Sequence, residues 1–174
     1  MQVSQTDIDY LKVIRKNVRN HIWKALSYYR DGDRVLDIAP QVHQGAKEFF
    51  EKVETLDIEP GADHQADICE DNSDIIPNNT FDIIICTEVL EHVSNPFDAV
   101  KELHRMLKPG GLLFLTTPFN FRIHGPLPDN WRFTEHGLRQ LFNGWHINIS
   151  EIGSDRFLMP VHYSVTAQKK HAHN

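Results

Sequence analysis

The sequence predicts a doubly wound, Rossmann-like α/β fold: a mostly parallel seven-stranded sheet with helices on both faces and its last strand antiparallel. Three observations predict it: strand patterns alternate with helix patterns, two buried strands end in a carboxylate, and a short turn joins the last two strand patterns. Strands that alternate with helices form a parallel sheet through right-handed crossovers. A short turn cannot hold a crossover helix, so the last two strands are expected to pair antiparallel.

Length and composition fit one domain that spans residues 1–174. It is predicted to comprise an N-terminal helix (1–30), a core (31–168) and a C-terminal tail that we expect to be disordered (169–174). The hydrophobic share of 40% and the charged share of 24% are ordinary for a globular protein. No apolar run nears the roughly 20 residues of a membrane-spanning helix, and the amino end lacks a leader pattern. We therefore expect a cytoplasmic protein with no membrane partner.

Charge, cysteines and histidines argue against several classes of site. The net charge of −6 opposes non-specific attraction to nucleic acid, so no nucleic-acid partner is predicted. Cys69 and Cys86 lack metal-ligand or disulfide spacing and are expected to be reduced and at least partly buried. No pair among the 11 histidines has the His-x-x-x-His spacing around an acid that indicates zinc, so no metal is predicted.

The first predicted element is a helix from Thr6 to Tyr29. Its apolar side chains recur at steps of three and four and so form one stripe, which comprises Ile8, Leu11, Ile14, Val18, Ile22, Leu26 and Tyr29. Asp31-Gly32 suits the end of this helix. We expect the helix to cover one face of the sheet or to shield one end of its ligand crevice.

A βαβ unit follows. It comprises a strand from Arg34 to Ile38, a helix from about Gln44 to Glu51, and a strand from Val53 to Ile58. Asp37 and Asp57 lie at the carboxyl ends of the two strands, at the edge where an open α/β sheet places its ligand crevice. Because an acid after the second strand can accept from ribose hydroxyls, a nucleoside-containing cofactor is the first hypothesis.

The remaining elements are inferred from buried runs, turn residues and caps. They are a weak strand around His64 to Ile68, a strand from Phe81 to Cys86, a helix from Asn95-Pro96 to Lys108, a strand from Gly111 to Thr117, a helix from Thr134 to Phe142, and strands from Trp145 to Ile152 and Val161 to Gln168. The irregular stretch from Pro118 to Trp131 lies beside the strand ends, where such a loop is more often functional than disordered.

With these elements placed, the chain resembles class I S-adenosylmethionine-dependent methyltransferases of the small type 11 group. The similar segments are, in order, VLDIAP, VETLDIEP, ADI, FDIIICTEVLEHV, LKPGGLLFLTTP and WRFT, over roughly residues 30 to 168. The pair FDIIICTEVLEHV and LKPGGLLFLTTP is the most specific. The resemblance implies S-adenosyl-L-methionine as cofactor and methyl transfer to a small-molecule substrate.

By position, the resemblance also implies a cofactor site. It comprises Asp37 and Ala39 near the methionine end, Asp57 on the ribose hydroxyls, Ile58, Asp67 and Ile68 around the adenine, and Cys86, Thr87 and Glu88 beside the sulfonium. An acid that closes a buried strand can instead cap the next turn, and for Asp67 the two interpretations are evenly balanced. The 20-residue offset between Asp37 and Asp57 favours the ribose contact. Cys86 fits a packed small side chain better than a nucleophile.

The loop after Asp37 departs from the family pattern. Family members usually carry Gly-x-Gly there, because glycine permits positive φ and a close approach of the backbone to the cofactor. Ala39, Pro40 and Gln41 occupy these places, and Pro40 removes an N–H. Either the loop follows another path that uses Gly45, or the cofactor binds weakly or not at all.

The chemistry that the resemblance implies is an in-line attack of a nucleophile on the sulfonium methyl, without a covalent enzyme intermediate. For an oxygen acceptor, His92, His124 and Asp129 are candidate general bases. An alternative is that Glu91 and His92 only hold the segment after the strand that precedes them.

The irregular loop supplies candidate substrate contacts. Phe119, Trp131 and Arg132 would form an aromatic-walled pocket with one cation, although Trp131 and Phe133 can instead clasp the loop to the sheet. The WRFT segment is similar to relatives associated with sugar or polysaccharide biosynthesis, which favours a small polar metabolite, for example a sugar-related acceptor. We expect an open acceptor site or one completed by a second subunit, as in a homodimer.

Two other classes of function remain open. A non-catalytic binding or scaffold module with the methyltransferase fold is supported by the missing glycines. A nicotinamide-dependent oxidoreductase also uses a βαβ unit with a terminal acid, but it needs the glycine turn more strictly.

Overall fold

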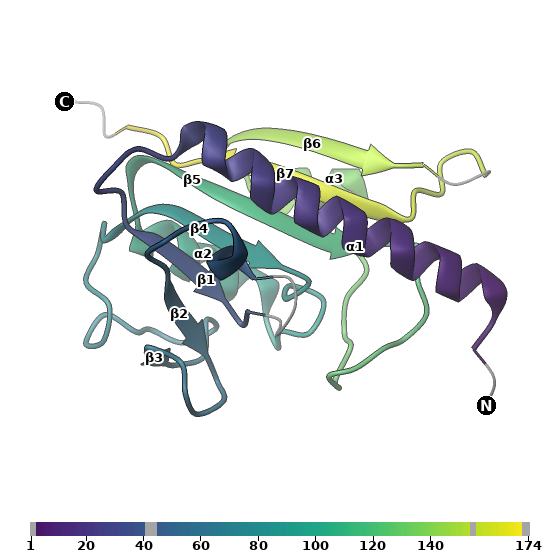
Figure 1. The fold of residues 1–174 in the computed structure, drawn as a ribbon, viewed down its shortest axis with the longest axis horizontal. Helices are drawn as coiled ribbons and strands as arrows, with labels where there is room; N and C mark the ends of the chain where they lie inside the picture. Colours follow the sequence, from purple (N-terminus) through teal and green to yellow (C-terminus); the bar gives the residue numbers. More distant parts are fainter. Residues whose placement is uncertain (1–2, 41–44, 154–155, 172–174) are drawn as a thin grey trace.

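The computed structural model describes residues 3–40, 45–153 and 156–171. Its seven strands form one sheet in the order β3-β2-β1-β4-β5-β7-β6 (Figure 1). The strands are β1 (Val35–Ile38), β2 (Glu54–Asp57), β3 (His64–Gln65), β4 (Phe81–Thr87), β5 (Leu107–Pro118), β6 (His146–Ile152) and β7 (His162–Gln168). Neighbours from β3 to β5 pair in parallel, whereas β7 runs antiparallel to both β5 and β6. The predicted fold class is confirmed.

Helices cover both faces of this sheet. They are α1 (Gln5–Ala25), the 3-10 turns η1 (Leu26–Tyr28) and η2 (Ala46–Glu48), α2 (Pro96–Met106) and α3 (Glu135–Leu141). Helix α1 lies across one face, and α2 and α3 lie on the other (Figure 1). Side chains along β4 alternate accordingly, because Ile83 and Ile85 belong to the core on the α1 side and Ile84 and Cys86 to the core on the α2 side.

The first predicted helix is confirmed, but α1 starts one residue earlier, at Gln5, and ends at Ala25, after which the 3-10 turn η1 continues to Tyr28. Ser4 is the N-cap, and its side chain accepts from the Asp7 N–H at 3.1 Å. Ile14, Val18 and Ile22 are buried and follow one another at steps of four, so this stripe packs onto the sheet. The helix therefore covers a face of the sheet, which is one of the two expected placements.

The predicted helix from about Gln44 to Glu51 is wrong. Its first residue lies outside the described residues, and the remainder forms only the 3-10 turn η2. Asp37 Oδ2 accepts from the Ala46 N–H at 2.6 Å and fixes the start of this turn. Phe49 then leaves helical geometry at φ −120°, and Phe50 packs into the core. The chain therefore turns back toward β2 after a single turn.

The boundary between α2 and β5 also differs from the prediction. The sequence predicts that the helix reaches Lys108 and that the strand begins at Gly111, yet β5 already begins at Leu107, directly after α2. Leu107 pairs with Phe81 at the start of β4, which brings this segment into the sheet before the turn residues. Gly110 takes φ +81° within it, a conformation that glycine adopts without steric cost.

The last helix and the closing hairpin are confirmed. Thr134 caps α3, and its hydroxyl accepts from the Gly137 N–H at 3.1 Å. Leu138, Leu141 and Phe142 are buried, as expected. The weak strand predicted around His64 to Ile68 is present but shorter, as β3.

The two cysteines match their prediction. Cys86 is buried, Cys69 is half-buried, and both are free thiols. Among the described residues, no helix has the length and apolar character needed to cross a membrane.

Candidate functional site

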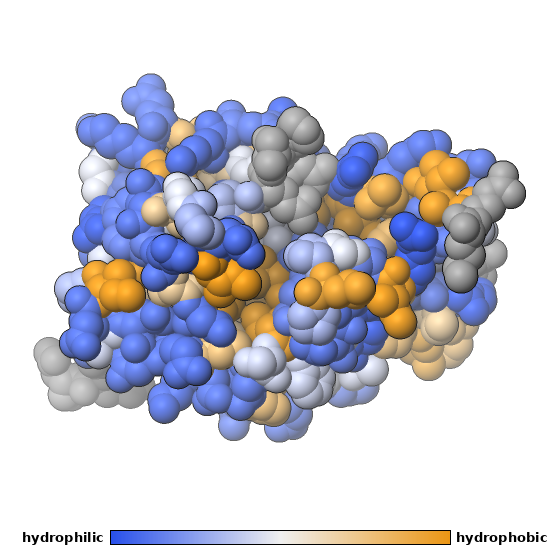
Figure 2. All heavy atoms as spheres, turned by 90° about the horizontal axis from the view of Figure 1, so that it is seen from below, coloured by the Kyte–Doolittle hydropathy of each residue, from blue (hydrophilic) through white to orange (hydrophobic). Residues whose placement is uncertain are grey.

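A cavity of about 700 Å³ lies at the carboxyl ends of β1, β2 and β4, against the loop that follows β5. Its lining is mostly apolar and includes Ile38, Leu56 and Val89. Figure 2 shows apolar surface within a hollow that hydrophilic surface flanks. Parallel strands end at one edge of a sheet, which is where α/β folds bind their ligands. The cavity occupies the position of the crevice expected from the sequence.

Six of the nine predicted cofactor residues line this cavity, namely Ala39, Asp57, Ile58, Asp67, Ile68 and Glu88. Asp57 Oδ1 accepts from the Glu59 N–H at 3.0 Å, and Asp67 Oδ1 accepts from the Cys69 N–H at 2.8 Å. Each carboxylate therefore caps the turn after its strand, as the alternative interpretation held. A carboxylate has about four lone-pair sites, so both side chains keep capacity for ligand donors.

The loop after β1 takes the conformation that glycine favours, although it carries alanine. Ala39 has φ +46°, and its N–H donates to Leu56 O at 2.7 Å. A non-glycine residue in this left-handed region costs about 1–2 kcal/mol. Ala39 and Pro40 both line the cavity, whereas Gln41 lies outside the described residues. Gly45 has φ −82°, so glycine's conformational freedom is not used there.

Three predicted residues are absent from the cavity lining: Asp37, Cys86 and Thr87. All three are buried. Burial raises the pKa of Asp37 to about 7, although the hydrogen bond that its side chain accepts from the Ala46 N–H acts to lower this pKa. Burial also raises the pKa of the Cys86 thiol, which agrees with a packed rather than a nucleophilic cysteine.

Glu88 does line the cavity, in the turn that follows β4. It has φ +56°, and its Oε1 accepts from the Thr116 hydroxyl at 2.9 Å and from His162 Nε2 at 2.6 Å. Asn17 Nδ2 donates to His162 Nδ1 at 2.7 Å, which leaves the Nε2 proton for Glu88. Burial pushes the pKa of Glu88 upward, but His162 and Thr116 outweigh it and hold this pKa below its usual value. Glu88 is therefore an anchored carboxylate.

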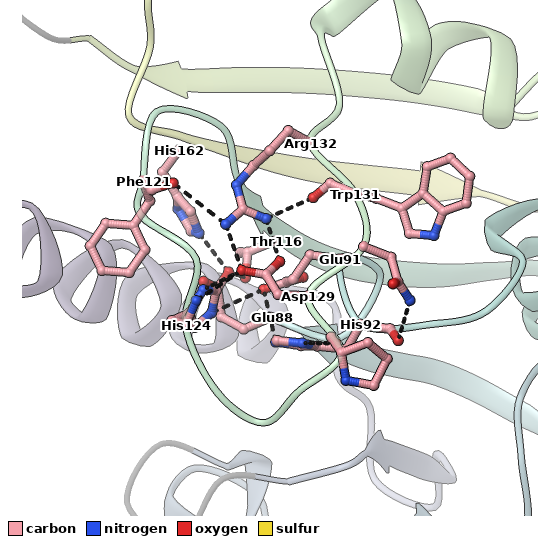
Figure 3. A network of polar contacts seen from close by, with 12 residues as sticks. Glu88, Glu91, His92, Thr116, Phe121, His124, Asp129, Trp131, Arg132 and His162 are labelled. Atoms are coloured by element: carbon pink, nitrogen blue, oxygen red, sulfur yellow. Dashed lines mark hydrogen bonds and ion pairs between the residues drawn. The ribbon is translucent and has the colours of Figure 1, made fainter.

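Glu91 has no comparable partners. Its side chain is fully buried, and neither carboxyl oxygen has a hydrogen-bond partner among the described residues. His92 Nε2 and His124 Nε2 lie 3.7 and 3.8 Å from Glu91 Oε1 (Figure 3). His92 Nδ1 lies 3.0 Å from Pro128 O, to which it donates. Burial, together with the nearby Glu88 carboxylate, raises the pKa of Glu91 well above its usual value.

The loop after β5 is fastened to the turn between β4 and α2. The backbone N–H groups of Asn130 and Trp131 donate to Glu91 O at 2.7 and 3.0 Å. Their side chains, through Asn130 Nδ2 and Trp131 Nε1, donate to Val93 O at 3.1 and 2.8 Å. Trp131 also stacks on Phe133, with ring centroids 6.3 Å apart. Trp131 thus holds the loop, as the alternative interpretation expected, but to the turn between β4 and α2 rather than to the sheet.

Arg132 is engaged inside the same loop. Its Nη2 donates to Asp129 Oδ2 at 2.7 Å, and its other contacts include loop carbonyls (Figure 3). Asp129 Oδ2 also accepts from the His124 backbone N–H at 3.0 Å. Burial pushes the pKa of Asp129 upward, but Arg132 and His124 outweigh it and lower this pKa to about 2. Burial lowers the pKa of His124. The guanidinium is thus committed to Asp129.

The structure brings the predicted catalytic residues together, but not the predicted substrate residues. His92 lines the cavity, and the His124 ring packs edge-on against it with centroids 5.1 Å apart. The predicted substrate residues do not line the cavity: Phe119, Trp131 and Arg132. Sequence reasoning missed the residues that anchor Glu88, namely Asn17, Thr116 and His162. No local pattern marks them, because only folding brings α1, β5 and β7 together.

The comparison with protein families gives one match. The model of the family described as "Methyltransferase domain" matches residues 12–148, which is most of the chain. The match includes the carboxyl ends of β1, β2 and β4, where the cavity lies.

Curated relatives match over shorter segments. A ubiquinone biosynthesis O-methyltransferase from Pseudomonas syringae pv. tomato is 44% identical over 48 residues, which cover 28% of this chain and 20% of that protein. The protein of the same name from Xanthomonas campestris pv. campestris is 33% identical over 82 residues, which cover 47% of this chain and 32% of that protein. The chain thus matches less than a third of the length of these relatives.

Solved structures with the same fold cover nearly the whole chain. A SAM-dependent methyltransferase from Methanosarcina mazei gives a TM-score of 0.63 at 18% identity and covers 85% of this chain and 97% of that chain. A SAM-dependent methyltransferase from Archaeoglobus fulgidus gives a TM-score of 0.65 at 15% identity and covers 89% of this chain and 94% of that chain. Phosphoethanolamine N-methyltransferase 2 of Haemonchus contortus, in complex with S-adenosyl-L-methionine, gives a TM-score of 0.66 at 15% identity. This match covers 89% of this chain and 52% of that chain. The chain belongs to the methyltransferase domain family, and its fold is that of class I S-adenosylmethionine-dependent methyltransferases.

Proposed function

We propose that this chain binds S-adenosyl-L-methionine in the cavity and transfers its methyl group to a hydroxyl of a small polar metabolite. The observation that carries the proposal is the meeting of Asp57 and Asp67 in one apolar cavity at the strand ends. Membership of the methyltransferase family supports the reaction class. The cavity volume of about 700 Å³ lies within the range of roughly 300–1,000 Å³ that ligand pockets occupy.

The cavity lining supports one orientation of the cofactor. Asp57 would accept hydrogen bonds from the ribose hydroxyls, and Ile58 and Ile68 would cover the adenine ring. Asp67 would accept a hydrogen bond from the exocyclic amine of the adenine. The methionine end would then lie along Ala39 and the turn that contains Glu88. This orientation places the sulfonium toward the part of the lining that His92, Pro128 and Asn130 form.

The reaction needs little covalent chemistry from the protein. The acceptor oxygen would form a bond to the methyl carbon as the carbon–sulfur bond breaks, which converts the sulfonium into a neutral thioether. The acceptor hydroxyl must also lose its proton. His92 is the predicted base that lines the cavity, whereas His124 and Asp129 lie beside it. Alignment and exclusion of water would supply most of the remaining rate enhancement.

Two observations support a hydroxyl acceptor on a small polar molecule. The partial relatives are named as O-methyltransferases, which favours oxygen as the acceptor atom. Ser94 and Asn130 line the cavity together with His92, and such polar residues would suit a hydroxyl-rich molecule such as a sugar derivative. Arg132 pairs with Asp129 and does not line the cavity, so the proposal gives it no contact with the substrate.

The substitution Asp57→Asn tests the proposal. Asparagine keeps the shape and the acceptor for the Glu59 N–H, but it removes the charge that a bidentate ribose contact uses. We expect calorimetric titration to show binding of S-adenosyl-L-methionine that is weaker by about 1.5–3 kcal/mol, or roughly 10- to 150-fold. Asp74→Asn is the matched control, because Asp74 is exposed and does not line the cavity. Equal affinities of the two variants would contradict the ribose assignment.

A non-catalytic binding module is the second candidate, and the loop after β1 favours it. Ala39 and Pro40 replace the usual glycines at the cavity, and Pro40 offers no N–H to the methionine carboxylate. Absence of heat and of a thermal shift at millimolar S-adenosyl-L-methionine would favour this candidate over the enzyme. A homodimer stays a prediction.

A further inference from the structure

The Glu91 side chain is the least satisfied polar group of the site. A buried carboxyl group normally has hydrogen-bond partners, because an unpaired one costs several kilocalories per mole. Glu91 has zero exposure, and both of its oxygens lack hydrogen-bond partners among the described residues. Its backbone carbonyl holds the loop after β5, but that contact needs no carboxyl group. Hydrogen bonds within the described part of the chain therefore do not explain why this carboxyl group is buried.

Two histidines face this carboxyl group. Glu91, His92 and His124 each offer one ligand atom, and these atoms all lie within 4.8 Å of one another. Both imidazoles present Nε2 to Glu91 Oε1, at 3.7 and 3.8 Å. These distances are too long for hydrogen bonds. Ligand atoms around a tetrahedral zinc ion lie roughly 3.3 Å apart. Each Nε2 would therefore close on Glu91 Oε1 by about half an ångström, and the two histidines would also approach each other.

The outer ring nitrogen of His92 is held as it is in metal sites, and that of His124 lies beside a carboxylate. Histidine ligands of metals usually direct their other ring N–H to a carbonyl or a carboxylate, which orients the ring. His92 Nδ1 donates to Pro128 O at 3.0 Å, so its Nε2 carries a free lone pair. His124 Nδ1 lies 3.1 Å from Asp129 Oδ2, although the two are out of line for a hydrogen bond. Arg132 in turn fixes Asp129.

We propose that Glu91 Oε1, His92 Nε2 and His124 Nε2 bind one divalent first-row transition-metal ion at the edge of the cavity. Two imidazoles and one carboxylate suit Zn²⁺, Co²⁺, Mn²⁺ or Fe²⁺, whereas Mg²⁺ and Ca²⁺ prefer oxygen ligands. Three protein ligands leave coordination positions open, which is typical of catalytic rather than structural metal sites. His92 lines the cavity, so an open position would face the ligand space.

The consequence for the reaction rests on the proposed function. A hydroxyl that coordinates a divalent cation loses its proton more readily, as metal-bound water does. The bound ion would occupy the lone pair of His92, so the ion rather than His92 would activate the acceptor. Its proton would leave to solvent, and the resulting alkoxide would attack the methyl carbon.

Titration of the full chain with ZnCl₂ and CoCl₂, without S-adenosyl-L-methionine, tests the site. We expect one ion to bind per chain, to raise the thermal unfolding temperature and to give Co²⁺ absorption bands in the visible region. Glu91→Gln should weaken binding by about 100-fold or more, because ligands matter at least as much as the groups that orient them. Asp129→Asn, which changes a positioning residue, should weaken it by about 10- to 100-fold.

Matched histidine variants separate this site from adventitious binding. His104→Gln should bind the ion as the unchanged chain does, because the His104 ring packs on Trp145, away from the cluster. His171→Gln/His173→Gln removes the histidines of the sequence KKHAHN and should also keep binding. Loss of the ion with either control, or equal affinity in Glu91→Gln and the unchanged chain, would overturn the proposal, as would no binding at all.

Two further variants keep the test decisive. If Glu91→Gln does not fold, His124→Asn removes a half-buried ligand and should produce the same loss of the ion. Asp57→Asn should keep the ion. If the unchanged chain binds the metal but not S-adenosyl-L-methionine, the proposed function fails while the metal site stands; if it binds the cofactor but no metal, the metal site fails alone.

Discussion

Ala39 combines backbone strain with a place at the cavity. It holds φ +46° where related methyltransferases usually carry glycine, and the hydrogen bond from its N–H to Leu56 O keeps it there. The backbone thus approaches the cavity as it would with glycine, and the methyl group of alanine adds a cost of about 1–2 kcal/mol. The strain is therefore tolerated at a site where shape matters for ligand binding.

Ala39→Gly should release this strain. We expect the free energy of unfolding to rise by about 0.5–1 kcal/mol, because the relief exceeds the extra freedom that glycine gives the unfolded chain. Urea unfolding measures it. Ala25→Gly is the control with the opposite sign: Ala25 has φ −61° at the end of α1, where glycine should cost about 1 kcal/mol. A loss of stability in Ala39→Gly would contradict the account.

Individual residues differ in how far sequence alone could place them. Asp57 and Asp67 could be predicted at the cavity, because each closes a strand and parallel strands end together. Glu91 and His124 could not be paired in advance, because they are far apart in sequence and only the fold of the loop joins them. Asp37 closes a strand as well, but its side chain turns to the η2 backbone instead of the cavity.

At the scale of elements, strands with clear turn signals were predictable and short connections were not. The strand β4 follows directly from its buried apolar run, and the antiparallel hairpin of β6 and β7 follows from the short turn between them. The segment that contains η2 has the composition of a helix, yet the packing of Phe50 ends it after one turn. Tertiary contacts therefore override local propensity in that connection.

Helix α1 carries a titratable group into the core. His21 is buried against β7, with Nε2 3.0 Å from Val165 O and its ring packed on Phe114 at 5.3 Å. Burial lowers the pKa of His21 to about 4, and Lys24 and His162 act in the same direction. The ring is therefore neutral in the folded protein near neutral pH.

Acid should weaken the docking of α1. The unfolded chain binds a proton at His21 near pH 6.5, whereas the folded chain does so only near pH 4. The stabilising contribution is therefore complete above pH 6.5 and is lost as pH falls toward 4, by an amount on the order of 3 kcal/mol. Urea unfolding at pH 7.5 and at pH 5 should show about 2 kcal/mol of this loss, because pH 5 still lies above the folded-state pKa of His21. His21→Gln should flatten this dependence, and His146→Gln, at an exposed position of β6, should keep it. A steep dependence in His21→Gln would assign the effect to other groups.

At the scale of the whole molecule, one sheet with both faces covered suggests one cooperative unit. The two cores lie on opposite faces of the same central strands. Unfolding of these strands would therefore disrupt both cores together. We expect urea unfolding to be two-state. Far-UV circular dichroism and tryptophan fluorescence should give coincident transitions, because Trp23, Trp131 and Trp145 report on α1, the loop after β5 and the start of β6. Separate transitions would instead indicate two domains.

The contacts that hold the loop after β5 also affect how the substrate specificity of this fold could change. The contacts that hold the loop include those to the carbonyl oxygens of Glu91 and Val93, while the end of the cavity that we propose for adenosine is formed by β1, β2 and the turns that follow them. In the proposed orientation of the cofactor, insertions or deletions between Gly125 and Asn130 would change the size of the acceptor end of the cavity and leave the adenosine end unchanged. Replacing residues 125–130 with the corresponding segment of a relative would therefore be a direct way to change the methyl acceptor.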